Sequence, residues 1–223
     1  MTSLNTSLRE PCGREYYDVN YRNYERQNSA KKIRFYLCLL EQRISPRDTI
    51  FELGCGLGRF LQQAAKTYSC FGCDLNEYGV ALTRKTVPTA VVLQGSYQTL
   101  PRDLKPKAVV AWDVLEHLPD LSNALTCIHT GLDEQGYLLG VVPIYDGPLG
   151  WITKHLDQDP THLTKWSRSA WLNSLKNHGY EVVDWGGIIR RLFMDRWYVH
   201  ATRPQCVLRH YCSAMYFVAR VRS

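Results

Sequence analysis

Short apolar runs alternate with helical segments through the middle of the sequence. Each run is four to seven residues long, and the segments between them show apolar residues at helical spacing. Strands that alternate with helices in this way predict a mostly parallel sheet with helices on both faces. The predicted strands are residues 49–53, 70–74, 91–94, 108–112 and 136–142, and the predicted helices are residues 59–67, 77–85 and 121–132.

The N-terminal part has a different pattern. Residues 16–24 are rich in tyrosine and show no strand alternation, whereas Ile33, Leu37 and Leu40 follow the spacing of a buried helix face. The tyrosine-rich start predicts either a lid over the site or a helix packed against the sheet edge.

The C-terminal part predicts further elements of the same fold. We expect a loop or lid over residues 144–165, a helix over 167–178, and strands at 180–185 and 214–221, while residues 188–212 stay unassigned. The predicted architecture is one α/β domain with a seven-stranded sheet. Its parts are an N-terminal helical lid (residues 1–47), a core (48–187) and a C-terminal extension with the last strand (188–223).

Composition and charge narrow the class of protein. A chain of 223 residues with 45% hydrophobic residues can bury a core, and the cysteines lack framework spacing, which favours reduced thiols. The net charge of +6 is uneven: residues 1–47 carry 9 basic and 5 acidic side chains, and residues 188–223 carry 7 and 1. We expect a cytoplasmic protein without a membrane span. A nucleic-acid partner is the less favoured reading of the basic ends, and a homo-oligomer stays open.

A glycine-rich loop follows the first predicted strand. Gly54, Gly56 and Gly58 come directly after Glu52, where the strand gives way to a helix. Glycines let the backbone approach a ligand, and the helix start offers free N–H groups, so the loop predicts a nucleotide cofactor. Arg59 stands where a dinucleotide fold needs a small residue, which disfavours a pyrophosphate.

Asp74 ends the second strand, twenty residues after Gly54, where a carboxylate can bind both ribose hydroxyls. Together with the glycine loop and the segment Trp112–Asp120, this pattern resembles class I S-adenosylmethionine-dependent methyltransferases. Within them it is similar to the small-molecule branch that includes the ubiquinone and menaquinone biosynthesis enzymes. The resemblance implies a Rossmann-like fold, S-adenosyl-L-methionine as cofactor, and a set of cofactor-binding residues. This set is Glu52, Gly54, Cys55, Gly56, Gly58, Asp74, Leu75, Ser96, Tyr97, Asp113 and Val114.

One position departs from the family pattern. Such enzymes usually have an aspartate after the third strand to bind the adenine amine, and here Gly95 is followed by Ser96 and Tyr97. Either the Ser96 hydroxyl replaces that carboxylate, or backbone groups and stacking hold the adenine.

The motif after the fourth strand leaves two interpretations open. On a helix, Asp113, Glu116 and His117 share a face, and with His155 or His162 they could hold a divalent metal. The simpler interpretation, which we adopt, is that Glu116 and His117 shape the pocket, so no metal ligand is assigned.

The loop after the fifth strand supplies the candidate catalytic residues. A phenol or enol acceptor needs a base, and a histidine side chain suits that role near neutral pH. His162 is the first candidate and His155 the second. The candidate substrate-binding residues are Tyr17, Tyr21, His117, Tyr145 and Trp151.

The expected function is methyl transfer from S-adenosylmethionine to an oxygen, nitrogen or carbon atom of a small molecule. Two alternatives remain. The first is a nucleic-acid or protein methyltransferase, for which the basic ends are the only support. The second is a non-catalytic partner subunit that binds the cofactor.

Overall fold

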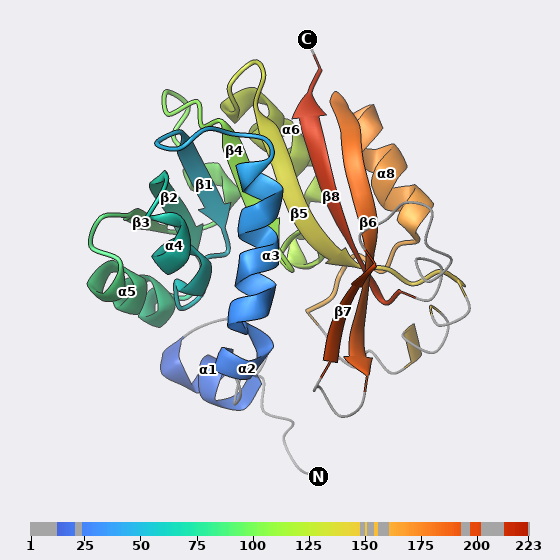
Figure 1. Ribbon diagram of the computed structural model, residues 1–223, viewed down its shortest axis with the longest axis horizontal. Helices are drawn as coiled ribbons and strands as arrows, with labels where there is room; N and C mark the ends of the chain where they lie inside the picture. Colours follow the sequence, from blue (N-terminus) through green and yellow to red (C-terminus); the bar gives the residue numbers. More distant parts are fainter. Residues whose placement is uncertain are drawn as a thin grey trace.

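The computed structural model describes residues 13–20, 24–147, 150, 154–155, 161–192, 197–201 and 212–222. Eight strands form one sheet in the order β3-β2-β1-β4-β5-β8-β6-β7 (Figure 1). The first seven of these in the sheet order are the predicted strands, and the eighth, β7 (Trp197–Ala201), lies at the edge. The class I methyltransferase fold expected from the sequence is thereby confirmed.

Five parallel strands make up one part of the sheet. They are β1 (Thr49–Leu53), β2 (Ser69–Asp74), β3 (Val91–Gln94), β4 (Ala108–Trp112) and β5 (Tyr137–Pro143). Each pairs in parallel with its neighbour, and Glu52 of β1 aligns with Gly72 of β2 and Val110 of β4. The carboxyl ends of these strands therefore meet at one edge, where parallel sheets bind ligands.

The remaining strands close the sheet with antiparallel pairs. β8 (Ala214–Val221) lies between β5 and β6 (Tyr180–Leu192), and β7 pairs with β6. β6 extends seven residues beyond the predicted end at Trp185, and β7 falls in the unassigned stretch. A register shift between Val182 and Asp184 interrupts the pairing of β6 with β8.

Helices cover both faces of the sheet (Figure 1). On one face lie α3 (Ala30–Glu41), α4 (Arg59–Ala64) and α5 (Glu77–Thr86), and on the other lie α6 (Leu121–Gly131) and α8 (Arg168–Asn177). Successive strand residues point to opposite faces, so Val109 packs against the α6 side and Val110 against the α3 side. Cys70 and Cys73 are buried on opposite faces for the same reason, and both are free thiols.

The N-terminal segment divides into two parts. Ile33, Tyr36 and Leu40 of α3 are buried in the core, because the amphipathic pattern of this helix turns them toward the sheet. The lid predicted over residues 1–47 is therefore smaller than expected. Among the described residues of this segment, the short helices α1 (Gly13–Asn20) and α2 (Tyr24–Gln27) lie at the carboxyl edge of the parallel strands (Figure 1). We call α1 and α2 the cap.

Within the described residues, the structure contains no helix with the length and hydrophobicity that a membrane crossing requires.

Candidate active site

The glycine loop adopts a conformation that only glycine takes up without strain. Gly54 has φ 70° and Gly58 has φ 74°, both in the left-handed region. A Cβ atom on Gly54 would lie 2.5 Å from Cγ2 of Val114, and one on Gly58 would lie 2.6 Å from Cγ2 of Thr83. The loop is thus packed directly against the segment after β4 and against α5, so its shape is fixed by both neighbours.

Asp74 holds the glycine loop from the end of β2. Its Oδ2 accepts a hydrogen bond from the Gly56 N–H at 2.8 Å, and its Oδ1 accepts one from the Asn76 N–H at 2.8 Å. Burial raises the pKa of the Asp74 carboxyl, and these two hydrogen bonds partly oppose that shift. The N-cap of α5 is Asn76, whose side chain accepts from the Gly79 N–H, so Asp74 itself is not the cap.

Glu52 is a buried carboxylate beneath the same loop. Its side chain is 3% exposed, and its Oε2 has no hydrogen-bond partner among the described residues. Burial raises the pKa of Glu52 well above its ordinary value, and the charge of Asp74 adds to the shift. A buried carboxylate of this kind is stabilised by a cation, which a ligand can bring.

The cap reaches the glycine loop through two tyrosines. The Tyr24 hydroxyl accepts a hydrogen bond from the Leu57 N–H at 3.1 Å, and burial raises the pKa of Tyr24. Tyr17 is 7% exposed and packs edge to face against Tyr24, with ring centroids 6.0 Å apart. The Asn76 side-chain amide donates to the Gly13 carbonyl at 2.9 Å, which ties α1 to the start of α5.

Asp113 does not share a helix face with Glu116 and His117, and this correction has a clear cause. Asp113 has φ 59°, and the turn that follows is only a three-residue 3-10 helix, η3 (Leu115–His117). The Asp113 carboxylate instead pairs with Lys32 of α3 at 3.3 Å. It therefore helps to fix α3 to the end of β4.

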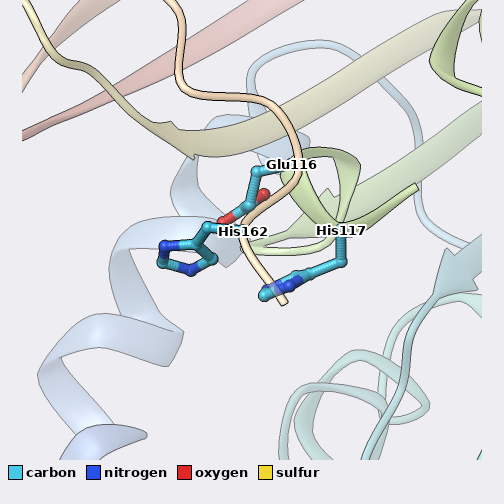
Figure 2. Close-up of side chains that lie close together, drawn as sticks. All are labelled: Glu116, His117 and His162. Atoms are coloured by element: carbon cyan, nitrogen blue, oxygen red, sulfur yellow. The ribbon is translucent and has the colours of Figure 1, made fainter. Parts of the chain in front are cut away.

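Glu116, His117 and His162 converge beyond the end of β4 (Figure 2). One ligand atom from each lies within 4.8 Å of the others. Glu116 is 1% exposed, and its carbonyl accepts hydrogen bonds from the N–H groups of Leu163 and Thr164, both at 3.0 Å. These two bonds bring the His162 segment onto η3, although the two are far apart in the sequence.

Each histidine of this cluster has a hydrogen-bonding neighbour. Nδ1 of His117 lies 3.0 Å from the carbonyl oxygen of Thr161 and 3.0 Å from its Oγ1. Nδ1 of His162 lies 3.2 Å from the Tyr145 hydroxyl, and the two imidazole rings are 4.8 Å apart. The predicted residues His117, Tyr145 and His162 thus form one connected group.

The other predicted residues are placed differently. Leu75 directly follows β2 and is 54% exposed, so its apolar side chain can cover a ligand, while Cys55 within the glycine loop is buried. Tyr97 is buried in the core, and its hydroxyl accepts from the Asn123 amide at 3.0 Å, whereas Ser96 precedes the 3-10 helix η2 (Tyr97–Thr99). His155 is exposed and is not part of the Glu116 cluster. Tyr21 and Trp151 lie outside the described residues.

The prediction from sequence omitted three residues that shape this region. Tyr24 was visible only as one of several tyrosines, and Asn76 only as a residue at a helix start. Glu116 was expected only to shape the pocket and was not assigned a binding role, because a carboxylate beside a histidine is common in sequences. Its burial at 1% exposure is the feature that sets it apart.

Comparison with known proteins identifies the family. Residues 22–184 match the profile of a family described as a methyltransferase domain, and this match spans most of the chain. The chain therefore belongs to this methyltransferase family. No curated protein matches the sequence at a significant level.

Solved structures of methyltransferases share the fold. One belongs to a complex that contains the Trm112 methyltransferase activator of Haloferax volcanii (TM-score 0.71, 18% identity, covering 94% of this chain and 97% of that one). A second is an S-adenosylmethionine-dependent methyltransferase from Thermotoga maritima (TM-score 0.70, 16% identity, 93% and 98% covered). A third is a methyltransferase from Archaeoglobus fulgidus that depends on the same cofactor (TM-score 0.65, 16% identity, 90% and 99% covered).

The residues at the carboxyl edge fit S-adenosylmethionine. The left-handed glycines hold the loop in a fixed shape against Val114 and Thr83, and the buried Oε2 of Glu52 suits the positive charge of the methionine ammonium group. Asp74 stands at the strand end from which a carboxylate reaches ribose hydroxyls.

Proposed function

We propose that the protein transfers a methyl group from S-adenosylmethionine to an oxygen, nitrogen or carbon atom of a small-molecule acceptor. The observation that carries the proposal is the cap. Tyr17 and Tyr24 lie against the glycine loop, and Asn76 binds the backbone of α1, so the carboxyl edge is covered beside the cofactor loop. An edge covered in this way favours a small acceptor over a polymer.

The chain's own residues would orient the partners and exclude water. When bound, S-adenosylmethionine would supply a methyl group on a positively charged sulfur, and an electron-rich acceptor atom would take the methyl group while the sulfur leaves on the opposite side. Asp74 would bind the ribose, and Glu52 would face the ammonium group. Much of the rate enhancement would then come from alignment and from the removal of water.

An acceptor hydroxyl must lose its proton during the transfer. We propose His162 as the base, because it lies in the Glu116 cluster and the Tyr145 hydroxyl beside Nδ1 orients its ring. His117 and Tyr145 would contact the acceptor, together with Tyr17 of the cap. His155, Tyr21 and Trp151 stay predictions from the sequence.

A radiolabel experiment tests the proposal. The protein is incubated with S-adenosylmethionine labelled in its methyl group and, in separate reactions, with a panel of phenols, catechols and amines, with total RNA and with protein extract. The proposal predicts transfer to a member of the small-molecule panel, and Asp74→Ala should abolish it. Label found only in RNA or protein would contradict the small-molecule assignment. Cofactor binding without transfer in any reaction would favour the non-catalytic alternative.

A further inference from the structure

We propose that Glu116, His117 and His162 form a binding site for one divalent first-row transition-metal cation, such as Zn²⁺, Co²⁺ or Mn²⁺. This reverses the expectation that the site has no metal ligand. The site itself rests on the geometry of three side chains, and only its effect on the acceptor rests on the proposed function.

The spacing of the three ligand atoms suits one ion. All lie within 4.8 Å of one another. Ligands bonded to a tetrahedral ion at about 2.1 Å are about 3.4 Å apart. Closing the largest separation of 4.8 Å to this value takes a movement of about 0.7 Å by each partner, which side-chain rotation can supply.

The backbone holds the ligands in place before any ion binds. Glu116 and His117 belong to the same turn, η3, and the Glu116 carbonyl binds the N–H groups of Leu163 and Thr164 directly after His162. The site is thus built from two segments that are joined by hydrogen bonds. Such an arrangement lowers the cost of organising the ligands.

Neighbouring oxygen atoms orient the imidazole rings. The Thr161 carbonyl oxygen lies 3.0 Å from His117 Nδ1 and can only accept a hydrogen bond, which favours the tautomer with the proton on Nδ1. That tautomer puts the lone pair on Nε2. The Tyr145 hydroxyl at 3.2 Å occupies the corresponding position beside Nδ1 of His162. Metal-binding histidines commonly have an oxygen partner on the second ring nitrogen.

The donor set indicates the class of ion. Two imidazoles and one carboxylate favour first-row transition metals, whereas Mg²⁺ and Ca²⁺ prefer oxygen ligands. Three protein ligands leave a coordination position for water or an acceptor oxygen, as in catalytic metal sites. A cation bound there would lower the pKa of an acceptor hydroxyl at this position. The cation would then promote the loss of the acceptor proton, which is the role that we assign to His162 in the metal-free protein.

Metal titration of the untagged, chelator-treated protein tests the site. We expect wild-type protein to bind about one Co²⁺ per chain with a visible absorption spectrum of nitrogen and oxygen ligation. Glu116→Gln and His162→Ala should each weaken binding by more than about 100-fold, since loss of a residue that only hydrogen-bonds to a metal ligand already costs about 10 to 100-fold. His178→Ala removes a histidine at the end of α8, outside the cluster, and should bind Co²⁺ as the wild type does.

Three results would overturn the site: unchanged binding in the Glu116 and His162 variants, a spectrum of thiolate ligation from cysteines, or equal affinity for Mg²⁺. If a ligand variant fails to fold, as judged by circular dichroism, X-ray absorption of the Co²⁺-loaded wild type still reports whether histidines bind the ion. S-adenosylmethionine binding is measured on the same metal-free protein. Failure of the metal site therefore leaves the methyltransferase proposal to be judged separately.

Discussion

Gly79 tests whether the packing of α5 against the glycine loop sets the cofactor site. A Cβ atom at this position would lie 2.8 Å from the backbone oxygen of Gly56 and 2.7 Å from the Tyr17 hydroxyl. Ordinary contacts begin near 3.4 Å, so the substitution Gly79→Ala must displace the loop or the helix by about 0.5 Å.

The magnitude follows from two opposing effects. Overpacking of this kind costs about 1 to 3 kcal/mol, and replacing a helical glycine by alanine returns about 1 kcal/mol. We expect a net loss of stability of about 1 kcal/mol, which corresponds to a fall in Tm of about 2 to 4 °C. The displaced loop should weaken S-adenosylhomocysteine binding about tenfold, or about 1.4 kcal/mol.

Gly131→Ala is the matched control. Gly131 ends α6, and its added Cβ would lie 2.6 Å from Cδ2 of Leu100, the far end of a flexible side chain in the core. Calorimetric titration of both variants should show the affinity loss only in Gly79→Ala, even if the stability changes are similar. Wild-type affinity in Gly79→Ala would refute the reasoning.

Three further results are expected. The raised pKa of Glu52 means that the folded state favours the protonated carboxyl, so the stability of the wild type falls as the pH rises from the ordinary pKa of a glutamate toward the pKa of Glu52 in the folded protein. The Tm of Glu52→Gln should therefore rise relative to that of the wild type over this pH range. A difference in Tm that does not change with pH would contradict this. Tyr24→Phe removes the acceptor of the Leu57 N–H and should cost about 1 kcal/mol in urea unfolding, whereas an unchanged midpoint would rule out a contribution from this bond. Burial raises the pKa of Cys73 to about 11, so iodoacetamide should modify the half-buried Cys127 in the native protein and Cys73 only after unfolding. Alkylation of Cys73 in the native protein, detected by mass spectrometry, would refute its burial.

The sequence pattern predicts the regular elements well. The strands at 49–53, 91–94, 108–112 and 214–221 have the predicted bounds, since each contains a short run of apolar residues that the sequence pattern reveals. The extension of β6 and the edge strand β7 were not predicted. Their pairing is an antiparallel contact between segments, which local periodicity does not reveal.

The candidate site also has parts that the sequence predicts and parts that it does not. The glycine loop and Asp74 follow from a motif at fixed spacing, and the structure places them in contact through the Gly56 N–H. The approach of His162 to Glu116 depends on two hydrogen bonds from a distant loop to the Glu116 carbonyl. Asp113 to His117 do not form the helix on which the three side chains would share a face, because the left-handed backbone of Asp113 directs the chain into a short turn.

A crystal structure of the protein with S-adenosylhomocysteine tests the central claim most directly, namely that the carboxyl edge of the sheet brings the cofactor to the Glu116 cluster. We expect the ribose on Asp74, the ammonium group toward Glu52, and the sulfur facing Glu116, His117 and His162. A ligand bound elsewhere, or a sulfur turned away from these three side chains, would contradict it.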